Sequence, residues 1–509
     1  MSDFSIPSIR RDARTLILGL GQTGAASAQW CAAHGAPLRV LDTRASPAGL
    51  DGLREGLAAA DVDYRLGAEH FNDDALQGVC SVVISPGLPP GSEPVATLLA
   101  AAKQQGIEVI GEIELFARAL GDMAEQGYRP GVLAVTGTNG KTTVTVMARE
   151  LARASGYQAM AAGNIGPAAL AALLQACASG GLPEVWVLEL SSFQLASTYS
   201  LAPDAAVVLN ITQDHLDWHG SLESYAAAKA RLLKMAKVAV INRDDALVSA
   251  MVDEPRALSV RSFGRSLPVW EGDTGLDDSH DVSWLCVSEA VDFDTPVTTG
   301  RRKKNDPAPQ RAQGRVSRLM PADALRVRGV HNALNALAAL TLVRCLDAGW
   351  AGMLHALRDY PGEPNRTEFV RTVGGIDFIN DSKGTNVGAT LAALEGLGQP
   401  VVLIAGGLGK GQDFAPLAVA VREHARAVVL IGSDADLIAN ALHDVGLTVE
   451  KASSLEDAVR KGFALAREGD AVLLSPACAS MDMFRDYVHR GQVFVDAVDT
   501  LALDNGEVA

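Results

Sequence analysis

The chain has 509 residues, a formal net charge of −16 and a hydrophobic content of 48%. This is the composition of a folded globular protein, and at about 100–200 residues per domain its length predicts roughly three domains. Because nucleic-acid affinity comes largely from Lys and Arg that neutralise phosphates, the acidic balance argues against a nucleic-acid partner. No apolar run reaches about 18 residues and no signal-peptide pattern opens the chain, so we expect a cytoplasmic protein without a membrane span.

The first predicted unit alternates strands and helices. An apolar strand at 15–18, a helix at 24–34 and a strand at 38–41 that ends at Asp42 favour a parallel sheet. Residues 19–24 read Gly-Leu-Gly-Gln-Thr-Gly, a pattern that can hold a diphosphate at the N-terminus of a helix. The pattern alone leaves three alternatives: glycines that only permit close packing, a nicotinamide cofactor, or another ligand that carries a diphosphate.

The strongest motif is Thr-Gly-Thr-Asn-Gly-Lys-Thr-Thr at residues 136–143, between a buried strand at 132–135 and a helix that starts at Lys141. Backbone N–H groups of such a loop surround phosphate oxygens, Lys141 adds a positive charge, and the Thr142 hydroxyl can ligate Mg²⁺. Val135 stands where the strict pattern has its first glycine. The motif predicts ATP binding by Gly137, Thr138, Asn139, Gly140, Lys141, Thr142 and Thr143.

Acidic and histidine residues follow two further strands. Glu189 ends the apolar strand at 185–188, and the segment 214–219, which includes His215, follows the strand at 205–209. A carboxylate at the carboxyl edge of a parallel sheet suits Mg²⁺, which prefers oxygen ligands. A loop histidine is more often structural than catalytic, so both interpretations of His215 stay open. The pattern around Lys229 predicts only a lysine on a solvated helix face.

A third α/β unit is predicted from strands at 375–380, 401–405, 427–431 and 471–474. Between residues 292 and 318 the periodicity disappears, and Pro, Gly, Thr and basic residues predominate. This composition predicts a solvated surface loop, with a docking patch for an acidic partner as the alternative.

Together these motifs resemble the Mur ligase family over nearly the whole chain. The resemblance rests on segments 19–24, 42–44, 85–87, 136–143, 163–166, 189–194, 214–217, 331–335, 380–386 and 475–480. It implies a three-domain α/β protein: a Rossmann-like N-terminal domain for a UDP-sugar (1–111), a central P-loop-type ATPase domain with a parallel sheet and the insertion at 292–318 (112–362), and a Rossmann-like C-terminal domain for an amino acid (363–509). It also implies an ATP-dependent ligase that forms an amide through an acyl phosphate. Within the family, the resemblance is to the branch that joins D-glutamate to UDP-N-acetylmuramoyl-L-alanine in peptidoglycan precursor synthesis.

The resemblance assigns residues to each ligand. For the UDP-sugar it implies Gly21, Thr23, Gly24, Asp42, Thr43, Arg44, Ser85, Pro86, Gly87 and Asn164. For ATP it adds, beyond the phosphate loop, Asn332, Asn335, Arg366, Asp381 and Lys383. Two Mg²⁺ ions would be held by Thr142, Glu189, His215 and Lys229, the last as a carbamate, and the implied catalytic residues are Lys141, Glu189, His215 and Lys229. D-Glutamate would contact Thr385, Lys410, Ser480 and Tyr487, where related ligases have Phe at position 487.

Other functions remain as alternatives. One is a sister ligase for a different amino acid, or a folylpolyglutamate synthetase that shares the central ATPase; segments 189–194 and 475–482 favour the D-glutamate branch. Another is a nucleotide-binding scaffold without turnover, which the presence of Glu189, His215 and Lys229 disfavours. We expect a monomer whose partners are the small molecules UDP-N-acetylmuramoyl-L-alanine, D-glutamate and ATP.

Overall fold

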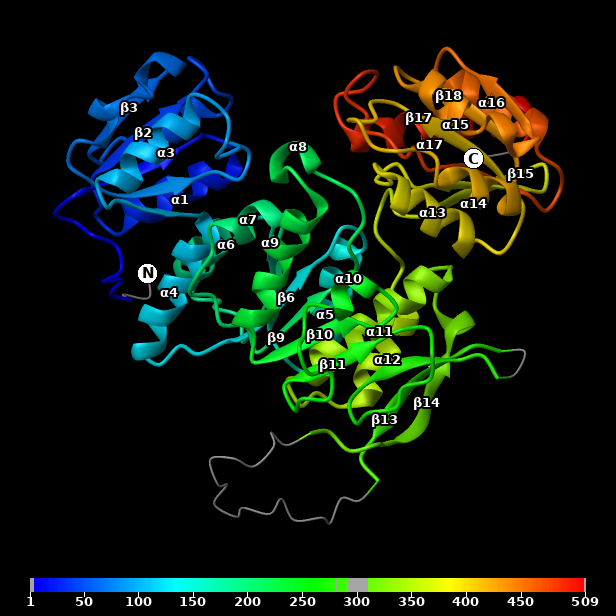
Figure 1. Ribbon diagram of the computed structural model, residues 1–509, viewed down its shortest axis with the longest axis horizontal. Helices are drawn as coiled ribbons and strands as arrows, with labels where there is room; N and C mark the ends of the chain where they lie inside the picture. The colour runs from blue at the N-terminus through cyan, green and yellow to red at the C-terminus, as the bar shows by residue number, and fades with distance from the viewer. Residues whose placement is uncertain (1–3, 280–281, 292–309, 508–509) are drawn as a thin grey trace.

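The structure is a computed structural model that describes residues 4–279, 282–291 and 310–507. Three sheets with helices packed around them follow one another along the chain (Figure 1), in the strand orders β3-β2-β1-β4-β5, β11-β10-β9-β6-β8-β7 and β15-β16-β20-β17-β18-β19. The predicted α/β class with three units in series is therefore confirmed. Within the described ranges, no helix combines the length and the apolar character that crossing a membrane requires.

The first sheet is entirely parallel. Its strands are β1 Arg14–Leu18, β2 Leu38–Asp42, β3 Val62–Leu66, β4 Val79–Ile84 and β5 Glu108–Ile110, and its helices are α1 Gln22–Ala33, α2 Leu50–Gly56 and α3 Val95–Gln104. β1 lies between β2 and β4, so the strand order reverses beside β1. At such a point the loops after the two neighbouring strands diverge, and a crevice forms at the carboxyl ends of β1 and β4. The turn at 19–24 and the segment that begins at Ser85 both lie at this crevice.

The second sheet is also parallel. Its strands are β6 Gly131–Thr136, β7 Ala159–Gly163, β8 Val185–Glu189, β9 Ala205–Val208, β10 Val238–Asn242 and β11 Val260–Phe263. Its helices are α4 Glu112–Glu125, α5 Lys141–Ala154, α6 Ala169–Ser179, α7 Ser192–Ala196, α8 Leu216–His219, α9 Leu222–Met235, α10 Ala246–Ser249, α11 Val330–Arg344 and α12 Trp350–Asp359. Since β6 lies between β8 and β9, the segments that follow these three strands meet at one edge of the sheet.

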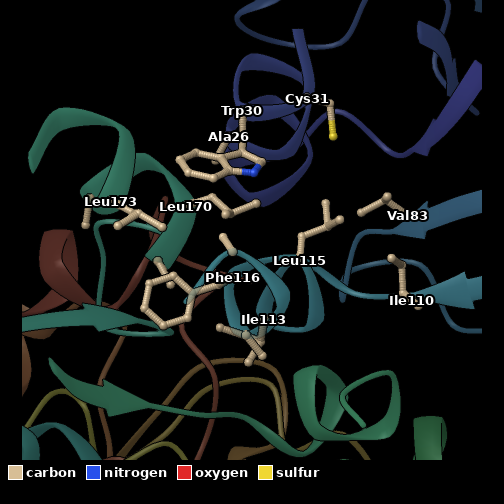
Figure 2. Packing of buried hydrophobic residues seen from close by; sticks show 14 of the residues in the cluster. Ala26, Trp30, Cys31, Val83, Ile110, Ile113, Leu115, Phe116, Leu170 and Leu173 are labelled. Carbon is tan, nitrogen blue, oxygen red and sulfur yellow. The ribbon is translucent and has the colours of Figure 1, made fainter. Parts of the chain in front are cut away.

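One apolar core joins the first unit to the second. Trp30 of α1 is 1% exposed and lies beside Leu170 and Leu173 of α6, while Phe116 of α4 packs below them (Figure 2). The rings of Phe116 and Trp186 meet edge to face with centroids 5.2 Å apart. Because this core is continuous across both units, it fixes the first sheet against the second.

The third unit has apolar clusters of its own. Its strands are β15 Glu368–Val373, β16 Ile376–Asn380, β17 Val401–Gly406, β18 Ala425–Ile431, β19 Thr448–Lys451 and β20 Ala471–Leu474, and its helices are α13 Val387–Gly396, α14 Leu417–His424, α15 Ala435–Ala441, α16 Leu455–Leu465 and α17 Tyr487–Asp504. All strand pairs are parallel except that of the edge strand β15 with β16. Both clusters draw only on residues 370–502, so this unit shares neither of them with the central one.

A three-stranded antiparallel sheet lies beside the second unit and corrects one prediction. It consists of β12 Thr274–Asp277, β13 Trp284–Glu289 and β14 Arg315–Pro321. The predicted loop at 292–318 is therefore wrong for residues 315–318, and Arg311 is buried in an ion pair with Asp273. An edge strand with one solvated face needs few apolar residues, so its composition resembles that of a loop. The rest of the predicted loop, residues 292–309, lies outside the described residues.

Candidate active site

The phosphate loop follows β6 and requires glycine at two positions. Gly137 has φ = 155°, and a Cβ there would lie 2.9 Å from the Cβ of Leu209. Gly140 has φ = 80°, and a Cβ there would lie 2.6 Å from Oδ1 of Asn335. Both positions adopt backbone conformations that side chains disfavour, so the glycines of the motif shape the loop and bring it against α11.

Asn210, a residue that sequence reasoning missed, holds the loop from the neighbouring strand. The N–H of Thr138 donates to the Asn210 carbonyl at 2.9 Å, and the N–H of Asn139 donates to Asn210 Oδ1 at 2.8 Å. The Asn210 amide returns a bond to the Asn139 carbonyl at 3.2 Å. The available signal was a polar residue two positions beyond the buried strand β9, at the same sheet edge as the loop.

Lys141, at the first position of α5, folds back over the phosphate loop. Its Nζ donates to the carbonyl oxygens of Gly137 and Thr138 at 3.0 and 2.8 Å. Burial lowers the pKa of Lys141, while the carboxylates of Glu189 and Asp214 act in the opposite direction. The ammonium thus lies at the loop that is predicted to surround the phosphates.

Two predicted residues bind Glu189, which ends β8 and is 2% exposed. Its Oε2 accepts from Thr142 Oγ1 at 2.8 Å, and its Oε1 accepts from Asn164 Nδ2 at 2.7 Å. Arg366 Nη2 donates to Thr142 Oγ1 at 2.5 Å. The structure therefore brings a hydroxyl, a carboxylate and a guanidinium from three separate motifs into one site.

The prediction that Lys229 lies on a solvated face is wrong. Lys229 is 1% exposed, and its Nζ donates to the Gly137 carbonyl at 2.8 Å and to Thr136 Oγ1 at 3.3 Å. The same Nζ lies 4.7 Å from the centroid of the Tyr225 ring. Burial, together with the charge of Lys141, holds the pKa of Lys229 well below its usual range. The local helical pattern could not reveal this because α9 packs beneath the phosphate loop only in the folded chain.

The two histidines of segment 214–219 have different surroundings. His219 Nε2 lies 2.9 Å from Ser192 Oγ, its ring stacks on Phe193, and burial lowers its pKa to about 4. His215 has φ = 54°, and its Nε2 lies 3.5 Å from Asp214 Oδ2. Burial lowers the pKa of His215 as well. A neutral imidazole is the form that ligates metals, so His215 stays the candidate ligand, whereas His219 is held in the packing.

A cavity of about 250 Å³ opens between the phosphate loop, α11 and the third unit. It is lined by eight of the predicted ATP residues, namely Asn139, Gly140, Thr143, Asn332, Asn335, Arg366, Asp381 and Lys383. Asn335 Nδ2 donates to Asn332 Oδ1 at 3.2 Å, so the two asparagines of α11 form one polar surface. The nucleotide residues that the resemblance implies are thus adjacent in space although they are far apart in the sequence.

A buried carboxyl group, Asp381, and a half-buried lysine, Lys383, from the third unit line this cavity. Burial raises the pKa of Asp381 to about 7, although Ser475 Oγ donates to its Oδ2 at 2.7 Å. The pKa of Lys383 is lowered to about 8, first by burial and then by the charges of Arg366 and Lys141. The Nζ of Lys383 also lies 3.8 Å from the centroid of the Tyr487 ring.

The lowered pKa of Lys383 predicts a pH dependence of nucleotide binding. The Lys383 amine is protonated below about pH 8 and loses its charge above this pH. The Kd of ADP should therefore rise about tenfold between pH 7 and pH 9.5, because ADP loses one hydrogen bond to a charged group. Calorimetric titration measures this Kd. Lys383→Arg should flatten the profile because guanidinium keeps its charge over this range; an identical rise in that variant would exclude Lys383 as the cause.

A pair of asparagines connects the phosphate loop directly to the third unit. Asn139 Nδ2 donates to Asn386 Oδ1 at 3.3 Å, and Asn386 Nδ2 donates to Asn139 Oδ1 at 3.0 Å. Asn386 also caps α13 by accepting from the N–H of Ala389. Asn386 belongs to the predicted motif at 380–386, but nothing in the sequence indicated that Asn139 would be its partner. With Arg366 and Thr142, this pair makes the contact between the two units polar.

The residues predicted for the amino acid are only partly brought together. Thr385 and Lys410 line a small cavity with Asp214 and His215, which places them opposite segment 214–219 of the second unit. Ser480 and Tyr487 do not line this cavity. Tyr487 begins α17 with its ring against Lys383, so it lies on the nucleotide side.

At the first glycine-rich turn, the packing and ligand interpretations apply to different glycines. A Cβ on Gly24 would lie 1.9 Å from the Gly19 carbonyl oxygen, whereas a Cβ on Gly21 would meet nothing within 4 Å. Asp42 accepts from the N–H of Leu20 at 2.7 Å and pairs with Arg44 at 2.8 Å. Gly24 therefore permits helix–strand packing, and open space remains beside Gly21 at the helix N-terminus.

The comparisons with known proteins agree with this geometry. Family models match at residues 13–111 (Mur ligase MurD-like, N-terminal domain), 135–343 (Mur ligase middle domain) and 365–478 (Mur ligase, glutamate ligase domain). The chain is 63% identical, over 97% of both chains, to the UDP-N-acetylmuramoylalanine--D-glutamate ligase of Bordetella avium. It is 51% identical to the ligase of the same name from Burkholderia thailandensis, over 98% of this chain and 99% of that one.

Solved structures agree on the fold. The MurF ligase of Thermotoga maritima in complex with ADP matches with a TM-score of 0.54 and 16% identity, over 86% of this chain and 92% of that one. The UDP-N-acetylmuramate-alanine ligase MurC of Thermotoga maritima matches with a TM-score of 0.52 and 18% identity, over 96% and 100%. The three-unit fold and the matched relatives define a class of ATP-dependent ligases, and the chain belongs to the Mur ligase family.

Proposed function

We propose that this chain joins D-glutamate to the carboxylate of UDP-N-acetylmuramoyl-L-alanine with cleavage of ATP to ADP and phosphate. The observation that carries the proposal is 63% identity over 97% of the chain to a ligase of that name. The enzyme is a cytoplasmic monomer of peptidoglycan precursor synthesis. Its UDP-sugar, ATP and amino-acid domains are residues 1–111, 112–362 and 363–509.

The first step brings two anions together. A carboxylate oxygen of the UDP-sugar attacks the γ-phosphorus of ATP, the bond to the β-phosphate breaks, and an acyl phosphate and ADP result. Lys141, Arg366 and the loop N–H groups offset the negative charge where it develops, as in other phosphoryl transfers. Asn164, which already donates to Glu189, is placed to orient the reacting carboxylate.

The residues at the phosphate loop fit Mg²⁺. Thr142 Oγ1 and Glu189 Oε2 lie 2.8 Å apart at the loop, which provides two oxygen ligands for one hard cation. His215 and Lys229 would hold a second ion, with Lys229 converted to a carbamate. Because burial lowers the pKa of the Lys229 amine, the amine is more readily neutral, and the neutral amine is the form that adds CO₂. Bound there, the metal ions neutralise phosphate charge. Among the described residues, no group of three or more His, Cys, Asp or Glu side chains is placed to hold a metal ion.

The second step forms the amide. The amine of D-glutamate attacks the acyl carbon, a tetrahedral intermediate forms, and phosphate leaves as the carbonyl is restored. Thr385 and Lys410 approach His215 across the cavity between the second and third units, so an amino acid bound by them faces the acyl phosphate. The polar contacts of Asn139 and Asn386 hold the third unit over the site, and closure there excludes water from the activated carbonyl.

Phosphate release with omission of each substrate tests the proposal. Release is expected only when UDP-N-acetylmuramoyl-L-alanine, D-glutamate, ATP and Mg²⁺ are all present, with L-glutamate and L-lysine inactive. Equal turnover with a different amino acid would assign the chain to a sister ligase instead. Turnover with a folate substrate would favour the folylpolyglutamate synthetase, and ATP binding without phosphate release would favour the scaffold.

A further inference from the structure

Arg490 of α17 is a buried cation without an acidic partner in the described chain. The residue is 0% exposed, and its guanidinium forms no ion pair with a described Asp or Glu. Its Nε donates to Ser382 Oγ at 3.0 Å, its Nη2 to the Ser382 carbonyl at 2.8 Å, and its Nη1 to the Cys478 carbonyl at 3.1 Å. All three acceptors are neutral. A buried charge satisfied only by neutral groups is costly, since its desolvation is not offset by an opposite charge.

These three bonds join the segments that carry the predicted amino-acid residues. Ser382 lies three positions before Thr385, and Cys478 lies two positions before Ser480. Ser382 Oγ in turn donates to the Tyr487 carbonyl at 2.8 Å, which ties the first turn of α17 to the same segment. Arg490 is therefore the shared support of three segments that meet at the carboxyl ends of β16 and β20.

Charged side chains of both signs lie on the segments that Arg490 joins. Lys383 adjoins Ser382, and Lys410 lies on the segment that follows β17, next to β20 in the sheet. Burial lowers the pKa of Arg490 to about 10, and Cys478, Asp482 and Asp381 act in the opposite direction. The Asp381 carboxyl is bound to Ser475 and to the N–H of Thr367, and burial raises its pKa to about 7. The Arg490 guanidinium itself is hydrogen-bonded only to neutral acceptors among the described residues.

We propose that Arg490 is a positioning and specificity residue for the amino-acid substrate. It holds segments 382–385 and 478–480 in register, and its unpaired buried charge selects a substrate with an anionic side chain, which supplies the missing negative charge. This inference rests on the proposed function, because it takes D-glutamate as the substrate. A neutral amino acid would leave the cation uncompensated, so it binds less tightly.

Arg490→Met and Arg490→Lys separate the charge from the shape. Loss of one interaction with a charged group changes binding by on the order of tenfold to 100-fold. Arg490→Met should raise the KM for D-glutamate by that factor, while the KM values for ATP and the UDP-sugar change less than about threefold. Arg490→Lys keeps the charge but loses the planar fork, so its KM for D-glutamate should fall between those of the wild type and the Met variant.

The matched control is Arg460→Met, an exposed arginine on α16, which should leave all three KM values unchanged. A folded Arg490→Met enzyme with an unchanged KM for D-glutamate would overturn the inference, as would equal rises in the KM for all three substrates, which would indicate a structural role only. If Arg490→Met does not fold, Arg490→Lys provides the test. In that variant, the inference requires the KM for D-glutamate to rise more than the KM for ATP. A wild type that does not use D-glutamate would refute the proposed function, whereas an active wild type with insensitive variants would refute only the role of Arg490.

Discussion

Replacing Lys229 by alanine should lower kcat by about 10³-fold or more, beyond the 10²–10³ that the loss of a single stabilising donor costs. Lys229 is buried beneath the phosphate loop, where its Nζ contacts the Gly137 carbonyl. If it acts as a carbamate, the variant loses an anionic oxygen ligand beside the phosphates. Steady-state phosphate release measures kcat, and thermal melting checks the fold, because the vacated space also leaves the Gly137 carbonyl without that donor.

Small carboxylic acids separate the carbamate from other roles of Lys229. Acetate or formate in excess should partly restore the activity of Lys229→Ala by supplying the missing oxygens. Lys234→Ala is the matched control, since Lys234 lies on the same helix but is exposed; its turnover should equal that of the wild type. Full activity of Lys229→Ala would remove the residue from the mechanism. An inactive variant that acids do not rescue would retain Lys229 but refute the carbamate.

Replacing Lys141 by alanine should lower kcat by on the order of 10²–10³, the effect of losing one group that stabilises a developing charge. The Lys141 ammonium lies over the loop carbonyls of Gly137 and Thr138, so it is placed to follow the phosphoryl group as it transfers. The measurement is kcat at saturating ATP, which separates a loss of turnover from weaker nucleotide binding.

Two comparisons sharpen the Lys141 result. Lys237→Ala is the control in the same unit, because Lys237 is exposed and pairs with Asp204. A change of less than about twofold is expected, since exposed pairs contribute little. Acetate should not rescue Lys141→Ala, because the missing group is a cation. Turnover of Lys141→Ala near that of the wild type would show that the loop does not act through this side chain.

The phosphate loop could be predicted from the sequence because its function depends on a local pattern. One strand is followed directly by the two glycines at 137 and 140, a lysine and a hydroxyl residue. The glycines themselves indicate the positive φ angles that the loop requires. Central strands such as β1, β6 and β17 were predicted for a similar reason, because buried parallel strands are continuous apolar runs, whereas β3, β4, β5, β7, β11, β15 and β19 were not predicted. What these signals share is that they do not depend on distant residues.

The functional residues that sequence reasoning missed depend on tertiary packing. Lys229 has the helical surroundings of a surface lysine, and only the position of α9 beneath the loop buries it. Asn210 and Asn386 gain their roles from partners that lie across a sheet edge or in another unit. β14 was not predicted because an exposed edge strand is nearly as polar as a loop. The ligand assignments implied by the family resemblance remain predictions that the variants above test.

Mass analysis of the nucleotide product tests the central claim most directly. The chain is incubated with ATP, Mg²⁺, UDP-N-acetylmuramoyl-L-alanine and isotopically labelled D-glutamate, and ADP and phosphate are quantified in the same sample. The proposed function predicts one labelled glutamate per UDP-sugar product, formed in equal amount with ADP and phosphate. Release of ADP without incorporation of the label, or incorporation of another amino acid in preference to D-glutamate, would contradict it.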